Sequence, residues 1–143
     1  MELSDLRLHS GYWYIATPYS KHPAGIDVAF RDACIAAGKL LAAGVHVYCP
    51  IAHAHPIATH GKLDHYSHDL FLPLDRQMME HAHGIIVVEM PGHATSRGVR
   101  FEIDYFDGER RPRVHLNWPE LRPVFRITQT AYELFSTSVL STP

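Results

Sequence analysis

The sequence predicts an α/β domain with three layers, in which helices cover both faces of a parallel β-sheet of about five strands in the order 2-1-3-4-5. Strand-like apolar runs alternate with amphipathic helix-like stretches, which is typical of this class. Residues 84–88 form a continuous apolar run, as expected for a central strand of a parallel sheet. The chain has 143 residues, 46% hydrophobic and 20% charged, which suits a single domain over residues 1–143. The expected architecture is flavodoxin- or Rossmann-like.

The first third of the chain predicts two strands and the helix between them. Residues 12–16 are aromatic and apolar and end at Thr17-Pro18, which indicates a buried first strand. Apolar residues recur at helical spacing from residue 26 to residue 41, so we expect an amphipathic helix that ends near Gly44. Residues 45–48 predict a short second strand, which Pro50 stops.

The middle of the chain is rich in histidine, glycine and proline. We expect residues 52–66 to be a long loop, and loops of that length in small domains are often functional. A helix is predicted over residues 72–82, with Pro73 tolerated in its first turn. The central strand then follows at residues 84–88.

The last third begins with a loop at residues 89–96 and an amphipathic helix over residues 97–106. Residues 113–117 predict another strand. The remainder is weakly patterned, and we expect one more strand near residues 124–127 and a helix over residues 129–134.

Composition excludes several classes of function. The formal net charge of −2 leaves no basic excess for binding a nucleic acid. No apolar run is long enough to span a bilayer, so we expect no membrane partner. The acidic first five residues do not resemble a signal peptide. The chain has two cysteines, too few for a disulfide framework, so a reduced, cytoplasmic protein is expected.

Glu102 is the first candidate for chemistry. It lies three residues after Val99 and four before Phe106, on the helix face that should pack against the sheet. A carboxylate on a buried face is costly unless it is paired or used. One interpretation is a salt bridge to Arg97 or Arg100, and the other is a functional carboxylate.

The location of the surrounding loops favours the interpretation of Glu102 as a functional carboxylate. In an open α/β sheet, ligands bind beyond the carboxyl ends of the strands, where the strand order reverses. If the first and central strands are neighbours, their following loops and Glu102 face one crevice. Ser96 and Gly98 stand at a helix N-terminus, where backbone N–H groups can hold a phosphate, although Ser96 is also an ordinary N-cap. The loop after the first strand contributes Thr17, Pro18, Tyr19 and Ser20.

Two further residues have a structural and a functional interpretation. Asp75 lies in the first turn of its predicted helix, where an acid complements the helix dipole, or it supplies a second carboxylate to the crevice. Tyr14 is either an aromatic core residue or a hydroxyl aimed at Glu102.

The segments T-P-Y-S at residues 17–20 and S-R-G-V-R-F-E at residues 96–102 resemble the nucleoside 2-deoxyribosyltransferase superfamily, which includes deoxynucleoside 5′-monophosphate N-glycosidases. The likeness covers roughly residues 12 to 117. It implies cleavage or transfer at the N-glycosidic bond of a 2′-deoxynucleoside or its 5′-monophosphate. No residue decides between hydrolysis and transfer.

The resemblance also implies a role for each candidate. Glu102 matches the nucleophile that attacks C1′, Asp75 the acid that protonates or orients the leaving base, and Tyr14 the tyrosine that holds the nucleophile. Ser96 matches a serine that contacts phosphate or sugar. The remaining residues expected to line the substrate pocket are Thr17, Pro18, Tyr19, Ser20 and Gly98. The resemblance implies no cofactor, and it implies a homodimer or higher homo-oligomer.

The histidines support a different hypothesis. Eight of the 12 lie between His53 and His93, and the pairs include His53-x-His55, His65-x-x-His68 and His81-x-His83. A His-based metal protein is therefore one alternative, although no HExxH motif occurs and we expect no metal site. A non-catalytic nucleotide-binding module on the same fold is the other alternative.

Overall fold

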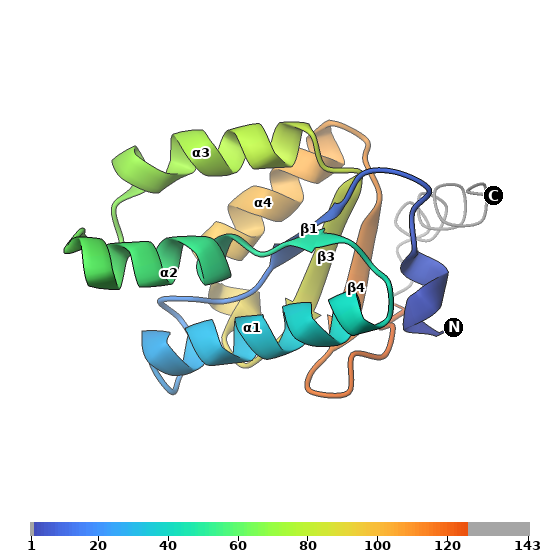
Figure 1. Ribbon diagram of the computed structural model, residues 1–143, viewed down its shortest axis with the longest axis horizontal. Coiled ribbons are helices and arrows are strands. Elements are labelled where there is room, and N and C mark those ends of the chain that lie inside the picture. The colour runs from blue at the N-terminus through green and yellow to red at the C-terminus, as the bar shows by residue number, and fades with distance from the viewer. Residues whose placement is uncertain (1, 126–143) are drawn as a thin grey trace.

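The sheet is parallel throughout, as predicted, and helices cover both of its faces (Figure 1). The computed structural model describes residues 2–125. Within this range the sheet has four strands in the order β2-β1-β3-β4. The elements are η1 (Leu3–Leu6), β1 (Trp13–Ala16), α1 (Ile26–Ala42), β2 (Val47–Tyr48), α2 (Pro50–Gly61), α3 (His68–Glu80), β3 (Gly84–Glu89), η2 (His93–Thr95), α4 (Arg97–Gly108) and β4 (Arg113–Asn117).

Each face of the sheet has its own apolar core. Because side chains alternate along a strand, Trp13 and Ile15 of β1 face one side, where they pack with α1 and the start of α2. Tyr14 and Ala16 face the other side, where they pack with α3 and α4. Figure 1 shows α1 on one side of the sheet and α3 with α4 on the other. The candidate residues Tyr14 and Glu102 therefore belong to the same layer.

The structure confirms the predicted strands at residues 12–16, 45–48, 84–88 and 113–117, with small differences in their ends. The strand expected near residues 124–127 is only partly described. Of that segment the structure describes residues 124 and 125, which are not in a strand, and an isolated antiparallel bridge between Leu116 and Pro123 comes just before it. The helix expected over residues 129–134 lies outside the described residues. In the described part of the chain, no helix is long and apolar enough to cross a membrane.

The prediction of a loop over residues 52–66 is wrong, because residues 50–61 form helix α2. Pro50 occupies the first turn, where proline is favoured, but Pro56 lies inside the helix and reads locally as a breaker. Packing overrides that local signal. Ile51 contacts the core on the α1 side of the sheet, and the His55 ring stacks on Phe30 of α1 with ring centroids 4.5 Å apart.

Helix α3 begins at His68, four residues before the predicted start. Ser67 is its N-cap, with the side chain accepting a hydrogen bond from the Leu70 N–H at 3.4 Å. Asp69 is consequently the acid of the first turn, and Asp75 lies in the middle of the helix. The interpretation of Asp75 as a complement to the helix dipole is therefore wrong, because that effect is confined to the first turn.

Gly84 allows β3 to enter the sheet beside β1 and β4. A Cβ at this position would lie 2.3 Å from the Pro112 carbonyl oxygen and 2.8 Å from the Trp13 ring. We expect Gly84→Ala to lower the free energy of unfolding by about 1–3 kcal/mol, because neither the backbone nor the buried ring can move aside. Gly38→Ala is the matched control, since nothing lies within 4 Å of its added Cβ in α1, and it should stabilise by up to about 1 kcal/mol. Urea unfolding of both variants checks this, and equal stabilities would contradict it.

Candidate functional site

A pocket opens beyond the carboxyl ends of β1 and β3, which are hydrogen-bonded neighbours. Its volume is about 380 Å³, a size suited to a small molecule. The β1–α1 loop, the start of α2, the start of α3 and the first turns of α4 form its walls. The residues that line it are Tyr14, Thr17, Tyr19, Ser20, Lys21, Pro50, Ile51, His65, Tyr66, Ser67, His68, Phe71, Leu72, Met79, Ser96, Arg97, Gly98, Phe101 and Glu102.

Glu102 occupies the inner end of this pocket. Its neighbours on α4, Val99, Ile103 and Phe106, are buried against the sheet, so the helix aims the carboxyl toward β1. The pKa of Glu102 is raised to about 8, mainly because the carboxyl is buried; the Tyr14 hydroxyl lowers this pKa and the nearby Asp75 charge raises it. Among the described residues Glu102 forms no ion pair, and Arg100 is instead 3.9 Å from Asp104. The salt-bridge interpretation of Glu102 is therefore not supported.

Tyr14 is fully buried, and its hydroxyl is next to Glu102. Burial, followed by the charges of Glu102 and Asp75, raises the pKa of Tyr14 well above its ordinary value, so the phenol keeps its proton. Within residues 2–125 the Tyr14 hydroxyl has no hydrogen-bond partner at ordinary hydrogen-bonding geometry. Its interaction with Glu102 is thus looser than a full hydrogen bond, and the oxygen keeps capacity for a further partner.

Asp75 is close enough for its charge to act on both Tyr14 and Glu102, but it is not among the residues that line the pocket. Its side chain is half-buried on α3, and burial raises the pKa of Asp75 to about 6. Its charge contributes to the raised pKa values of Glu102, Tyr14 and Tyr48. The structure therefore groups the two carboxyls, but only Glu102 is open to the pocket.

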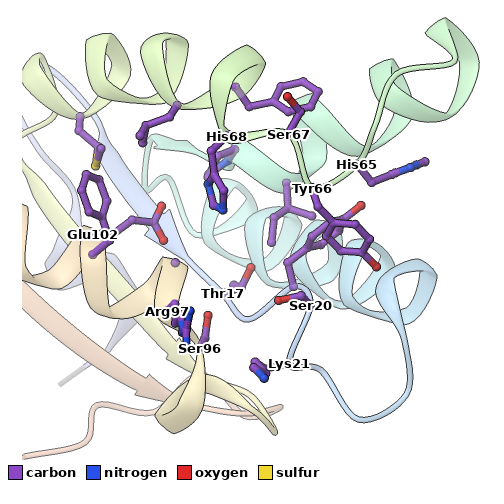
Figure 2. Close-up of a pocket in the computed structure, with 18 of the residues that line it drawn as sticks. Thr17, Ser20, Lys21, His65, Tyr66, Ser67, His68, Ser96, Arg97 and Glu102 are labelled. Carbon is purple, nitrogen blue, oxygen red and sulfur yellow. The ribbon is translucent and has the colours of Figure 1, made fainter.

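The opposite end of the pocket is polar and cationic. Ser96 caps α4, and its Oγ accepts a hydrogen bond from the Val99 N–H at 3.2 Å. The amides of Arg97 and Gly98 precede the first hydrogen bonds of the helix, so they point out of its N-terminus. Figure 2 shows the Arg97 side chain beside Ser96, with Lys21 on the same side of the pocket, below the Glu102 carboxylate in this view. This end suits an anionic group.

Gly92 brings the two loops of the polar end together. Its φ of +95° is a left-handed conformation, and a Cβ there would lie 2.2 Å from the Lys21 carbonyl oxygen. The β3–α4 loop can therefore pack against the backbone that carries Lys21.

The structure brings most of the predicted site residues together around one pocket. Tyr14, Thr17, Tyr19, Ser20, Ser96, Gly98 and Glu102 all line the pocket, whereas Pro18 and Asp75 do not. The sequence prediction missed Lys21 and His68. The signal for Lys21 was its position directly after T-P-Y-S, and the signal for His68 was the N-cap Ser67 that precedes it. In Figure 2 the His68 imidazole projects into the pocket from the start of α3, on the side of the pocket across from the Glu102 carboxylate.

Comparison with known proteins identifies the family to which the chain belongs. A family model described as Domain of unknown function (DUF1937) matches residues 11–117. The chain belongs to this family. The matched region runs from β1 to β4 and contains every residue of the pocket, so the sheet and the site are parts of one DUF1937 domain. No curated protein matches the sequence significantly.

Histidines of the DUF1937 domain pair with separate carboxylates and do not gather at one place. His22 is 3.2 Å from Asp32, His55 is 3.2 Å from Asp27, and His93 is 2.8 Å from Glu89. In the described part of the chain, no group of three or more His, Cys, Asp or Glu side chains is arranged to hold a metal ion.

The raised pKa of Glu102 has a consequence for stability. The folded domain holds this proton up to a pH of about 8, whereas the unfolded chain loses it near 4.5. The free energy of unfolding therefore falls as the pH rises between these values. Glu102→Gln stays neutral, so we expect its melting temperature to exceed the wild-type value by a few degrees near pH 9 and to be similar near pH 4. Calorimetry of both proteins checks this, and a variant that is less stable at high pH would contradict it.

Proposed function

We propose that this DUF1937 domain cleaves or transfers at the N-glycosidic bond of a 2′-deoxynucleoside 5′-monophosphate, with Glu102 as the nucleophile that attacks C1′. The observation that carries the proposal is the placement of a single pocket-facing carboxyl, backed by Tyr14 and Asp75, at one end of a small-molecule pocket whose other end is cationic. The resemblance of the T-P-Y-S and S-x-G-x-x-x-E segments to nucleoside 2-deoxyribosyltransferases agrees with this placement.

The chemistry needs a carboxylate beneath the sugar. As a Glu102 oxygen forms a bond to C1′, the bond from C1′ to the base nitrogen breaks, and its electron pair leaves with the base. The base takes up a proton as it departs. The resulting glycosyl ester is then attacked at C1′ by water, which gives hydrolysis, or by a second base, which gives transfer, and either attack restores the Glu102 carboxylate.

Two groups are candidates to assist the departing base. Asp75 is the acid that the resemblance implies, and it would act from behind the pocket lining. His68 lines the same pocket as Glu102 and its ring projects into it, and imidazole is the commonest general acid in enzymes. Tyr14 holds the Glu102 side chain in either case.

The cationic end supports a phosphorylated substrate. Lys21 and Arg97 line the same pocket, and the free N–H groups at the start of α4 are suited to phosphate oxygens. A 5′-phosphate bound there would extend the sugar toward Glu102 at the inner end.

The pKa of about 8 for Glu102 sets the pH dependence of this reaction. Only the ionised carboxylate attacks C1′, so kcat/KM should have a rising limb that follows the ionisation of Glu102, and loss of the proton from the group that assists the departing base should lower kcat/KM at higher pH. The Asp75 charge is one cause of the high value, so Asp75→Asn should move the rising limb to lower pH. A pH profile of both proteins checks this. A limb that stays in place would mean that Asp75 does not act on Glu102.

The second candidate is a non-catalytic nucleotide-binding module. It is favoured by the same high pKa, because a Glu102 that is mostly protonated at neutral pH can serve as a hydrogen-bond donor to a ligand. In that case a nucleotide binds and is released intact.

A panel assay tests the proposal. The protein is incubated with the four common 2′-deoxynucleosides and their 5′-monophosphates, with and without a second free base, and products are followed by chromatography. Release of base without exchange means a glycosidase, and exchange means a transferase. Binding without turnover would favour the module instead.

A further inference from the structure

Three side chains from separate elements form a connected chain that ends at the pocket. Tyr19, in the β1–α1 loop, has its hydroxyl hydrogen-bonded to Nδ1 of His55 on α2. Nε2 of the same ring lies 3.2 Å from a carboxylate oxygen of Asp27 at the start of α1. The order Asp27–His55–Tyr19 runs from solvent, where the Asp27 side chain is 94% exposed, to the pocket wall.

The His55 ring is held on every side. It is buried, it stacks on Phe30 with centroids 4.5 Å apart, and it meets the Tyr19 ring edge-on at 5.7 Å. The His65 ring is also adjacent, with centroids 5.1 Å apart. These contacts hold the ring with Nδ1 toward Tyr19 and Nε2 toward Asp27.

Proton positions follow from the partners. A carboxylate accepts hydrogen bonds, so Nε2 facing Asp27 carries the hydrogen. Burial and the nearby His65 lower the pKa of His55, so the ring is neutral near pH 7 and Nδ1 is an acceptor. Tyr19 must then donate its hydroxyl proton to Nδ1. Burial raises the pKa of Tyr19 to about 12, which keeps that proton on the phenol.

This arrangement leaves the Tyr19 oxygen with lone pairs only. Tyr19 and His55 both line a second, smaller cavity of about 110 Å³. That cavity adjoins the main pocket, since both are lined by Tyr19, Pro50, Ile51, His65 and Phe71. Its walls are largely apolar or aromatic, which suits the faces of a planar ring, and the edge of a ring that enters it can approach the Tyr19 oxygen.

We infer that Tyr19 is a hydrogen-bond acceptor that selects among ligands by the ring edge that enters this smaller cavity. The Asp27–His55 pair orients the Tyr19 hydroxyl. A ligand with an N–H donor on that edge is favoured, and a ligand with a carbonyl oxygen there is disfavoured. Resting on the proposed function, the ring is a nucleobase, and the favoured bases carry an amino group where others carry an oxo group. Tyr19 is the specificity residue, and His55 and Asp27 are positioning residues.

Two pairs of nucleotides differ in this amino or oxo group and, as a consequence, in the neighbouring ring nitrogen, which is an acceptor beside the amino group and an N–H donor beside the oxo group. The 5′-monophosphates of 2′-deoxyadenosine and 2′-deoxyinosine carry an amino or an oxo group at the same ring position, as do those of 2′-deoxycytidine and 2′-deoxyuridine. An oxo oxygen facing the Tyr19 lone pairs would leave both groups without a donor. We expect the amino member of at least one pair to bind about tenfold more tightly or better.

The experiment measures Kd by calorimetry for these four nucleotides with the wild-type protein and three variants. Tyr19→Phe removes the acceptor and should bring the amino-to-oxo ratio close to one. Asp27 is exposed, so Asp27→Asn should leave the packing intact. The new amide can donate a hydrogen bond to Nε2 of His55, which moves the ring hydrogen to Nδ1. The Tyr19 hydroxyl can then donate into the cavity, and the amino-to-oxo ratio should fall. Asp69→Asn, which removes an exposed acid of α3 outside the chain of contacts, should keep the wild-type ratio.

The outcomes separate this inference from the proposed function. Equal Kd values in the wild type, an oxo preference, or no binding by any of the four would overturn the selection by Tyr19. A ratio that survives both Tyr19→Phe and Asp27→Asn would do the same. An amino preference that depends on Tyr19, in a protein that turns over no nucleotide, would uphold the inference and reject the glycosyl chemistry.

Discussion

Glu102→Gln is expected to lower kcat for 2′-deoxynucleoside 5′-monophosphates by at least ~10³-fold, because an amide cannot form the bond to C1′. The amide has the shape of the carboxyl group and removes a buried ionisable group, so the fold should be retained. Nucleotide affinity should change little, since the phosphate end of the pocket is formed by other residues. Single-turnover assays of base release, together with Kd by calorimetry, measure the two effects separately.

The matched control lies two residues further along α4. Asp104 is also an acid, but its side chain is 65% exposed and its ionic partner is Arg100. Asp104→Asn should keep the wild-type kcat. Turnover that persists in Glu102→Gln, with the protein folded, would reject Glu102 as the nucleophile. Loss of turnover in both variants would point to a general disturbance of α4.

The second large effect is expected from the cationic end of the pocket. Lys21→Ala and Arg97→Ala should each raise KM for a 2′-deoxynucleoside 5′-monophosphate by about 10- to 100-fold, because a charge-assisted hydrogen bond to phosphate is worth about 1.5–3 kcal/mol. The corresponding unphosphorylated nucleoside has nothing to contact there, so its KM should not change. Steady-state kinetics on both substrates give the comparison.

Arg100→Ala is the control for this pair of variants. Arg100 lies on the same helix but does not line the pocket, and it contacts Asp104. We expect wild-type KM values for both substrates. If Lys21→Ala and Arg97→Ala weaken nucleoside and nucleotide equally, the phosphate does not bind at the N-terminus of α4 and the orientation of the proposed substrate is wrong.

The sequence by itself determined the sheet and the carboxyl that faces the pocket. The runs at β1 and β3 are apolar enough to be buried on both faces, and a parallel sheet brings the ends of adjacent strands to one edge. Helical periodicity alone placed Glu102 on the inner face of α4, beside Val99 and Phe106. These features depend on residues close together in the chain, where local patterns are informative.

Tertiary structure decided what depends on distant residues. Helix α2 forms despite Pro56 because His55 packs on Phe30 and Ile51 joins the core. The early start of α3 puts His68 in the pocket, and it leaves Asp75 near Glu102 but outside the lining.

The pKa of Glu102 and the contacts of Tyr19 also could not be predicted from local sequence patterns. A pKa of about 8 for Glu102 arises from burial by several elements together. The Asp27–His55–Tyr19 chain joins residues up to 36 positions apart. Hydrogen-bond direction and desolvation depend on which atoms meet in space, and periodicity along a chain carries no information about either.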